Sequence, residues 1–406
     1  MSAGLIQGEK RGFRAPGTSF MVSGGLIGAV GAYLFQLYGG RILGPADFAP
    51  VSVLWTTFFI LATILLVPVE QYVTREVAVG RRAIPTDLIP AAVMAGIGSL
   101  LGGLFVALTL DDLFNGDPQY ILHIVLLMVG YALLFVAKGV LAGSRQFKLV
   151  GWVLIVETAA RLFAGIVALQ FVANGVSLGW AMVIGGFAVL GLGWWRHDTG
   201  SEVEPSSPAR GFLAGYSGGT ASSQLLLGGA PIAVAALGAS PALISIVFVT
   251  FTLYRAPLTL IFALQGRILP YLVGLAKAED SARLGRIASR VVLFGTVLAV
   301  LGGLVGWLIG ADVVSVLYGE EFLPSRLMAM FAAAGVMAAA SAQIASQVLV
   351  AEGRTRRLAL AWLGGLVIAV FALLVLRGDP EVRVAGAFVI GEFVALGLMA
   401  LLAIRR

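Results

Sequence analysis

The sequence predicts an all-α polytopic membrane protein with about twelve transmembrane helices in two bundles. Hydrophobic residues make up 59% of the chain and charged residues only 12%, whereas soluble domains carry about 25% charged residues. The apolar residues form blocks of about 20 or more, the length that a helix needs to cross a hydrocarbon layer of about 30 Å. A weak repeat between the two halves of the chain is the third observation. Barrel strands would be about half as long and would alternate in polarity.

Short polar segments separate the blocks, as at "GPAD" after the first and "DDLFNGDPQ" after the third. The expected spans are 17–40, 47–69, 88–110, 119–142, 149–173, 176–195, 212–238, 242–265, 288–310, 326–350, 358–376 and 384–404. No small-residue cleavage site follows the first block, so we expect this span to stay in the membrane. The chain has no cysteine and therefore neither disulfides nor thiolate metal sites.

Basic residues gather on one side of this topology, which predicts that this side and both termini are cytoplasmic. The basic residues of that side are Lys10, Arg11, Arg14, Arg75, Arg81, Arg82, Arg145, Lys148, Arg196, Arg210, Lys277, Arg283, Arg286, Arg290, Arg354, Arg356, Arg357, Arg405 and Arg406. The other side has Arg41, Arg326, Arg377 and Arg383, and its loops "DDLFNGDPQ" and "YGEEF" are acidic. We interpret the basic loops as topology signals and expect no nucleic-acid partner.

The two halves share short patterns in the same order. "RGFRA" at 11–15 precedes the first span, and "RGFLA" at 210–214 opens the seventh. A Leu-Gly turn follows each of these spans, and basic turns, "LAGSRQFKL" and "VAEGRTRRL", follow the fourth and tenth. We therefore predict six-helix bundles at 1–200 and 201–406, joined by a cytoplasmic linker at about 196–210. An even number of spans per half makes the repeats parallel, related by a pseudo-two-fold axis along the membrane normal, with binding expected in a central cavity between them. The alternative is a duplication retained only for folding.

Arg255 is the most informative ionisable residue, because charge at bilayer depth is costly and usually faces a cavity or a partner. It lies about 20 Å into its span at 1.5 Å per residue, too deep for easy snorkelling, and Pro257 favours a kink beside it. A guanidinium binds phosphate through two oxygens and never deprotonates. Arg255 therefore suits a cavity that receives an anion, or else pairs with a carboxylate such as Glu157 or Glu392.

The remaining intramembrane charges have two interpretations each. Glu157 and Arg161 are four residues apart and share a helix face, as a self-neutralising pair or as a cavity or proton-coupling site. Glu392 is either paired across helices or a coupling carboxylate. Lys138 and Arg267 lie near span ends, where they snorkel or contact substrate. Glu70 closes the second span and is interpreted as an interface marker.

The sequence lacks the motifs for nucleotide-driven transport and for a zinc protease. No phosphate-binding loop followed by Lys and a hydroxyl is present, and neither His123 nor His197 is part of an HExxH motif. We interpret both histidines as peripheral. The one acidic cluster that could bind a metal is Asp111, Asp112 and Asp117. The alternative interpretation is a solvated outer loop. We expect no catalytic residue, metal or cofactor.

The sequence resembles the multidrug/oligosaccharidyl-lipid/polysaccharide flippase superfamily, and its polysaccharide-type lipid flippases in particular. The resemblance is carried by "GRILGPADF" at 40–48, "REVA" at 75–78, "GEEF" at 319–322 and "EGRTR" at 352–356. It implies two six-helix bundles around a central cavity that opens to each side in turn. Arg41 and Arg75 lie in these motifs and join Arg255, Arg161, Lys138 and Arg267 as candidate substrate-binding residues.

The resemblance also implies the function. We expect a flippase that moves a polyprenyl-pyrophosphate-linked oligosaccharide across the bacterial cytoplasmic membrane, with a glycan polymerase or glycosyltransferases of the same pathway as partners. Three alternatives remain: a flippase for peptidoglycan lipid precursors, a MATE-type exporter of small molecules, and a membrane-embedded glycan polymerase or glycosyltransferase. An organic-cation exporter is disfavoured by a basic cavity, and an enzyme would need a divalent metal and would change the glycan covalently.

The uneven distribution of basic residues yields a direct test of topology. Because the chain has no cysteine, single cysteines report on their own position. We expect an impermeant thiol reagent to label a cysteine introduced within residues 111–118 of intact cells but not Pro205→Cys. Labelling of Pro205→Cys in intact cells would show that the twelve-span map is wrong.

Overall fold

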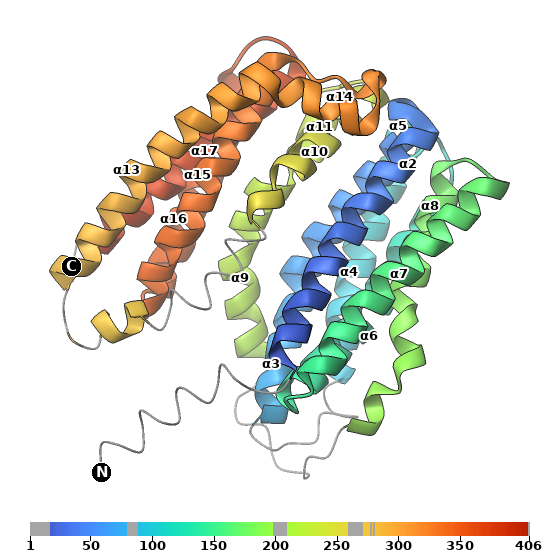
Figure 1. Cartoon of the computed structure of the whole chain (residues 1–406), viewed down its shortest axis with the longest axis horizontal. Helices are drawn as coiled ribbons and strands as arrows, with labels where there is room; N and C mark the ends of the chain where they lie inside the picture. Colours follow the sequence, from blue (N-terminus) through green and yellow to red (C-terminus); the bar gives the residue numbers. More distant parts are fainter. Residues whose placement is uncertain are drawn as a thin grey trace. The chain divides into compact units, whose positions relative to one another are not determined.

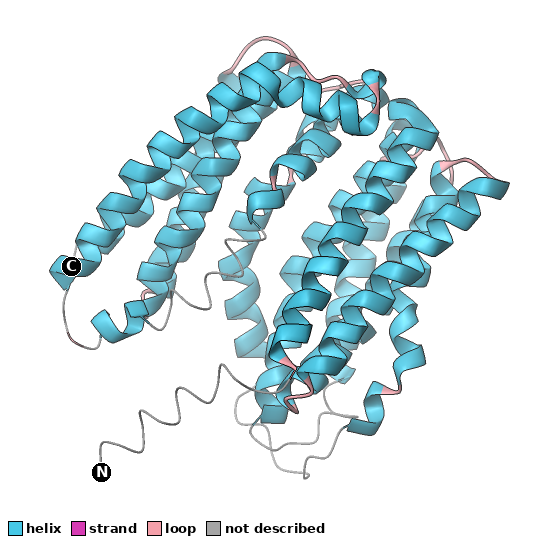
Figure 2. Cartoon of the chain, viewed as in Figure 1, coloured by secondary structure: helices cyan, strands magenta, loops and turns pink. Residues whose placement is uncertain are grey.

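The computed structural model describes residues 17–78, 88–197, 209–258, 271–276, 278 and 281–404. It is 91% helix, and the described residues contain no strand (Figure 2). The chain forms two compact units, Met1–Leu43 with Thr57–Ser217 and Gly44–Thr56 with Gly218–Arg406. Most of the predicted linker at 196–210 is outside the described residues.

The helices follow one another with short connections (Figure 1). Up to residue 197 they are α2 (Thr18–Leu61), η1 (Ala62–Leu66), α3 (Val67–Ala78), α4 (Leu88–Leu108), α5 (Leu110–Leu113), α6 (Gln119–Gly143), α7 (Phe147–Phe171), α8 (Gly175–Phe187), η2 (Ala188–Leu192) and η3 (Trp194–His197). From residue 209 they are α9 (Ala209–Gly228), α10 (Ala230–Ala236), α11 (Pro241–Tyr254), α13 (Ser281–Val305), η4 (Gly306–Gly310), α14 (Ala311–Tyr318), η5 (Glu320–Phe322), α15 (Arg326–Ala351), α16 (Thr355–Val375) and α17 (Pro380–Ile404).

Ten helices in the described part of the chain are long and apolar enough to cross a membrane. They account for eleven of the predicted spans, because the helical segment Thr18–Ala78 contains the first two. The seventh predicted span corresponds to α9 and α10, which are separated at Gly229. The eighth begins as α11, which ends at Tyr254, and helix resumes over residues 256–258. The chain is thus an all-helical, multi-pass membrane protein.

Gly44 replaces the loop that the sequence predicted between the first two spans. Its φ of 71° and ψ of 169° are the only non-helical backbone angles inside α2. Glycine reaches this left-handed region without a side-chain clash. Pro45 follows and starts the second arm, where its fixed φ suits a first helical turn.

The chain reverses direction at this glycine. Residues 24–35 lie along residues 151–165 of α7 in the same order, whereas residues 58–70 lie along residues 131–138 of α6 in the same order. Since α6 and α7 are antiparallel neighbours joined by a three-residue turn, the two arms of α2 are antiparallel as well. The "LGP" segment therefore connects two antiparallel helical arms, which together are labelled α2.

Glycines allow the helices of the first unit to approach closely. A Cβ atom placed on Gly24 would lie 2.6 Å from the carbonyl oxygen of Gly151 in α7. A Cβ on Gly186 of α8 would lie 2.7 Å from the ring of Tyr131 in α6. Such small residues are typical of membrane helices, where packing rather than the hydrophobic effect drives association.

Glycines also allow the helices of the second unit to approach closely. Its helices α13, α15, α16 and α17 run side by side (Figure 1). A Cβ on Gly365 of α16 would lie 2.7 Å from the carbonyl oxygen of Gly391 in α17. A Cβ on Gly391 would in turn lie 2.9 Å from the carbonyl oxygen of Gly365. Each glycine thus gives room to the backbone of the other helix.

The α6–α7 and α15–α16 turns have the same geometry, which supports the predicted repeat. Arg145 and Gly353 have left-handed φ values of 58° and 71°. In each turn the amide of the next residue donates a hydrogen bond to the carbonyl five residues earlier. These bonds are Gln146 N to Leu141 O at 2.7 Å and Arg354 N to Leu349 O at 2.8 Å. Both turns are Schellman motifs. Arg145 therefore corresponds to Gly353, one residue away from the alignment with Arg354 that the sequence suggested.

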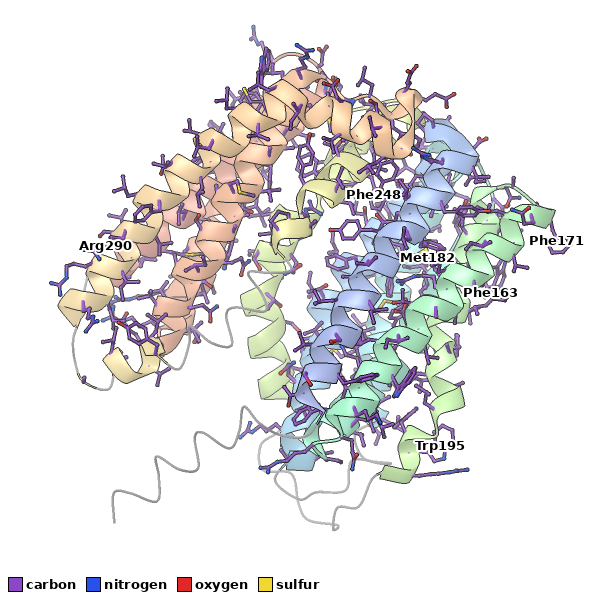
Figure 3. The ribbon with its side chains drawn as sticks, in the orientation of Figure 1. Phe163, Phe171, Met182, Trp195, Phe248 and Arg290 are labelled. Carbon is purple, nitrogen blue, oxygen red and sulfur yellow. The ribbon has the colours of Figure 1, made fainter. Side chains whose placement is uncertain are left out.

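Large apolar side chains cover the outside of the bundles. Phe163 and Phe171 are 70% and 83% exposed and point away from α7 (Figure 3). Met182 in α8 and Phe248 in α11 are instead buried (Figure 3). Exposed phenylalanines on a helix of this length are suited to contact lipid tails.

Close packing at Gly24 predicts a selective loss of stability. Gly24→Ala should destabilise the protein by about 1–3 kcal/mol, because the new methyl group meets the backbone of Gly151. Gly96→Ala in α4 is the matched control, since nothing lies within 4 Å of a Cβ there. The control should gain about 0.5–1 kcal/mol from improved helix propensity. Thermal unfolding in detergent measures both, and equal shifts would contradict the packing argument.

Candidate functional site

Glu157 and Arg161 form the ion pair that their spacing predicts. Arg161 Nη1 lies 2.6 Å from Glu157 Oε1, and both side chains are at least nine-tenths buried. Tyr131 of α6 donates its hydroxyl proton to Glu157 Oε1 at 2.5 Å and accepts from Arg161 at 2.9 Å. Thr158 donates to Glu157 Oε2 at 2.8 Å. Both carboxylate oxygens of Glu157 are therefore satisfied within the first unit.

Aromatic rings and glycines enclose this Glu157 network. The guanidinium of Arg161 lies 5.7 Å from the ring centre of Phe35, and Phe58 packs on Tyr131 at 4.5 Å. A Cβ on Gly185 would lie 2.8 Å from Arg161 Cβ. The geometry supports the self-neutralising interpretation of the pair.

Lys138 also has a carboxylate partner. Its Nζ lies 2.7 Å from Glu70 Oε2, with both side chains less than one-fifth exposed, and 4.6 Å from the ring centre of Phe135. Glu70 is thus an ion-pair partner and more than an interface marker. Lys138 lies two helical turns, about 10 Å, from Tyr131 along α6, so the two ion pairs do not form one cluster.

The other predicted cations are scattered. Arg41 and Arg75 are exposed at opposite ends of the α2–α3 hairpin. Arg267 lies outside the described residues. In the "EGRTR" segment, Arg354 forms an ion pair with Glu352 at 3.1 Å and donates a hydrogen bond to Leu402 O. Arg357, just after this segment, also donates a hydrogen bond to Leu402 O, at 3.1 Å. These basic side chains cap the C-terminus of α17, where cations are favourable.

Arg255 lies beside Pro257, where the sequence predicted a kink in the eighth span. It is the C-cap residue of α11, whose 14 residues place it about 21 Å from the helix start. Its amide still bonds to Phe251 O and Thr252 O, both at 3.2 Å. The guanidinium lies 5.5 Å from the ring centre of Phe251. The negative end of the α11 dipole and this ring both favour a cation here.

Glu392 in α17 is the most isolated carboxylate of the second unit. It is 0% exposed, and neither of its oxygens has a hydrogen-bond partner among the described residues. Arg255 is the charged group that interacts electrostatically with Glu392. The predicted pairing of Arg255 with a carboxylate therefore concerns Glu392 and not Glu157, which Arg161 occupies.

Two further predictions concerned metal ligands and histidines. Within the described residues no group of three or more His, Asp or Glu side chains comes together as a metal site, and this includes Asp111, Asp112 and Asp117. The interpretation of His123 as peripheral is wrong. His123 is 0% exposed, with its ring 4.7 Å from that of Trp180 and 5.4 Å from that of Tyr120.

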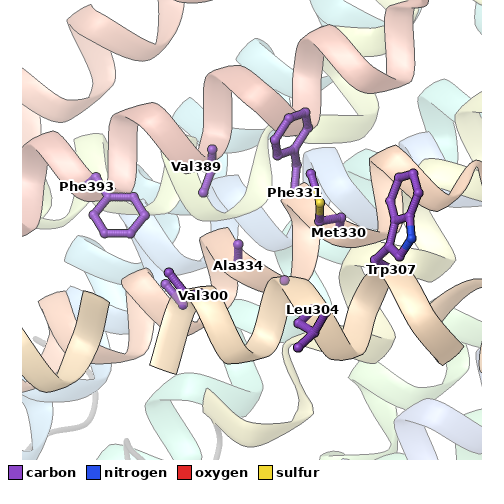
Figure 4. A pocket seen from close by; sticks show the side chains of 10 residues that line it. Val300, Leu304, Trp307, Met330, Phe331, Ala334, Val389 and Phe393 are labelled. Atoms are coloured by element: carbon purple, nitrogen blue, oxygen red, sulfur yellow. The ribbon is translucent and has the colours of Figure 1, made fainter. Parts of the chain in front are cut away.

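An apolar groove of about 590 Å³ lies between α13, α15 and α17 (Figure 4). All its lining residues are apolar, including Trp307, Phe331 and Phe393. It continues the exposed apolar side of α13, where Val300 is 66% and Leu304 53% exposed. A groove of this composition suits hydrocarbon and offers nothing to a phosphate.

Comparison with solved structures identifies the fold. The chain is similar to an inward-facing multidrug resistance MATE family transporter of the MOP superfamily, with a TM-score of 0.65 at 13% identity over 91% of this chain and 93% of that one. It is also similar to a mutant of the Vibrio cholerae MATE transporter VcmN, at a TM-score of 0.59 and 18% identity over 96% of both chains. The fold is that of the MATE transporters.

A eukaryotic MATE transporter, AtDTX14, gives a TM-score of 0.58 at 14% identity over 96% of this chain and 95% of that chain. No protein-family model and no curated protein matches the sequence. The MATE fold has twelve helices in two bundles, in agreement with the predicted architecture.

Tyr131, Thr158 and Glu70 are the site residues that sequence reasoning missed. Thr158 adjoins Glu157, and that proximity is a usable signal. Tyr131 and Glu70 come from other helices and have no local signal, because tertiary packing alone brings them to Glu157 and Lys138.

The Glu157 network predicts non-additive mutational effects. Either Glu157→Gln or Arg161→Met alone should lower the folded yield, because a buried charge left without its partner costs about 3–5 kcal/mol. The double variant should recover most of that yield. Folded yield by size-exclusion chromatography measures all three. A well-folded double variant without transport activity would indicate a functional pair instead.

Proposed function

We propose that the protein is an alternating-access transporter that moves a polyprenyl-pyrophosphate-linked oligosaccharide from the inner to the outer leaflet of the cytoplasmic membrane. The transporter class is supported by the MATE fold over nearly the whole chain. The anionic lipid substrate is supported by Arg255 and by the resemblance in the sequence motifs. Transport leaves the substrate covalently unchanged.

Arg255 carries the substrate proposal. A permanent cation about 21 Å along its span cannot easily reach the interface, so an anion that binds there is stabilised strongly. Helix α11 ends directly before Arg255, and Pro257, two residues on, lacks the amide hydrogen that a regular helix would use. A pyrophosphate crossing the bilayer needs such a donor, because its charge is otherwise poorly solvated at that depth.

Export of small organic molecules is the second candidate. It is favoured by one observation, that solved structures of this fold include multidrug resistance transporters. Arg255 argues against organic cations as substrates, and Glu392 argues for them. A direct comparison of the two substrate classes in one preparation decides between the candidates.

The substrate proposal predicts an ordered loss of transport in Arg255 variants. Arg255→Lys should flip lipid-linked oligosaccharide poorly, although it stays cationic, because an ammonium cannot hold two phosphate oxygens as the planar guanidinium does. Arg255→Ala should lose more. Flipping is measured in proteoliposomes with a lipid-linked oligosaccharide, at equal amounts of folded protein.

Arg290→Ala is the control, because Arg290 is an exposed cation at the cytoplasmic end of α13 (Figure 3). It should flip at the wild-type rate. A wild-type rate in well-folded Arg255→Ala would refute the role of Arg255. Efflux of an organic cation by a protein that does not flip the lipid would favour the exporter.

A further inference from the structure

Glu392 and Arg255 each lie one turn beyond the point where their two helices touch. Phe388 in α17 and Phe251 in α11 pack edge to face at 5.2 Å. Each of the two charged residues is four positions after its phenylalanine and therefore on the same helix face. Glu392 lies about 18 Å from the start of α17 and Arg255 about 21 Å from the start of α11, at 1.5 Å per residue. Both helices begin on the predicted outer side, so the two groups are at similar depth.

The surroundings of Glu392 supply no other charge. The charged residues of the helices that pack on α17 are Arg283, Arg286 and Arg290 at the start of α13, Arg326 at the start of α15, and Arg356 and Arg357 at the start of α16, whereas α10 has none. Helix α9, whose Leu226 lies beside Gly391, has Arg210 at its start. Glu381 and Arg383 lie at the start of α17 itself, and Tyr254 adjoins Arg255 on α11. At the depth of Glu392, Arg255 is the charged residue in the described part of the chain that acts on it.

An ionised carboxylate without hydrogen bonds is unfavourable in such a place. Two events relieve it: the carboxyl group takes up a proton, or the guanidinium of Arg255 moves into contact with it. The second event occupies the donors that we assign to the substrate anion. The carboxylate and the anion therefore compete for one guanidinium.

We propose that Glu392 is a proton-binding site whose occupancy decides whether Arg255 is available to an anionic substrate. This inference rests on the proposed function for the anion, but the proton site stands by itself. The proton comes from water and returns to water. When Glu392 is protonated, it no longer competes for Arg255, and a phosphate binds Arg255 more tightly. By reciprocity, binding of the anion favours uptake of a proton at Glu392.

The first arm of the test needs no substrate. Infrared difference spectra of the protein in lipid nanodiscs, recorded between mildly acidic and mildly alkaline pH, should contain the C=O band of a buried protonated carboxyl. Glu392→Gln should remove this band. Glu381→Gln, at the start of the same helix, should keep it. Arg255→Gln should extend the band to more alkaline pH, because the cation that stabilises the carboxylate is gone.

The second arm uses farnesyl pyrophosphate as the probe. Its affinity for the wild type should fall as the pH rises, by roughly 5- to 150-fold, the usual range for coupled sites. Glu392→Gln should bind it tightly with little pH dependence, whereas Glu381→Gln should behave as the wild type. Calorimetry in two buffers of different ionisation enthalpy should detect proton uptake that Glu392→Gln lacks. Protonation of the probe itself is common to all variants and cancels in the comparison.

The outcomes separate the two proposals. Absence of the Glu392-dependent band overturns the proton site. A band combined with equal pH dependence of binding in the wild type and Glu392→Gln overturns the competition for Arg255. Failure of the probe to bind the wild type, or equal binding by Arg255→Gln, overturns the anion role of Arg255 while the infrared result still decides Glu392. If Glu392→Gln folds poorly, the response of the band to Arg255→Gln is the remaining test.

Discussion

The cost of placing charge inside the bilayer governs this molecule. A membrane span tolerates an ionisable side chain when a partner, a dipole or a cavity compensates it. Arg161 has Glu157, Lys138 has Glu70, and Arg255 has the end of α11 together with the ring of Phe251. Each solution fixes a local geometry, because the partner must come from a neighbouring turn or helix. Glu392 stands apart, since its carboxylate has no hydrogen bond among the described residues.

This difference separates the polar interiors of the two units. In the first unit the Glu157 network joins four side chains through contacts that satisfy both carboxylate oxygens, with rings packed around them. Such a network holds helices in register. In the second unit a carboxylate and a guanidinium lie at one depth without a hydrogen bond between them. A buried carboxylate without a hydrogen bond retains the capacity to bind a proton.

Close helix packing makes both arrangements attainable. Where Gly24 meets Gly151 and Gly365 meets Gly391, backbones approach to a distance that any side chain would prevent. Short side chains such as that of Thr158 can then reach a neighbouring helix. Packing by small residues also explains why membrane helices of low sequence identity keep one fold: the contacts require smallness, which many sequences supply. A similar fold at 13% identity to a MATE transporter is understandable on this basis.

The sequence by itself determined the helical class, the order of the spans, the Glu157–Arg161 pair and the irregular backbone beside Pro257, because these follow from local hydrophobicity, helical spacing and proline. The tertiary structure decided the rest. It joined the first two spans through Gly44, brought Tyr131 to Glu157 and Glu70 to Lys138, and buried His123 among aromatic rings. It also set Glu392 opposite Arg255, which lies 137 positions earlier in the chain. Contacts between distant segments depend on how helices pack, and the hydrophobic periodicity within one helix does not predict which other helix it will contact.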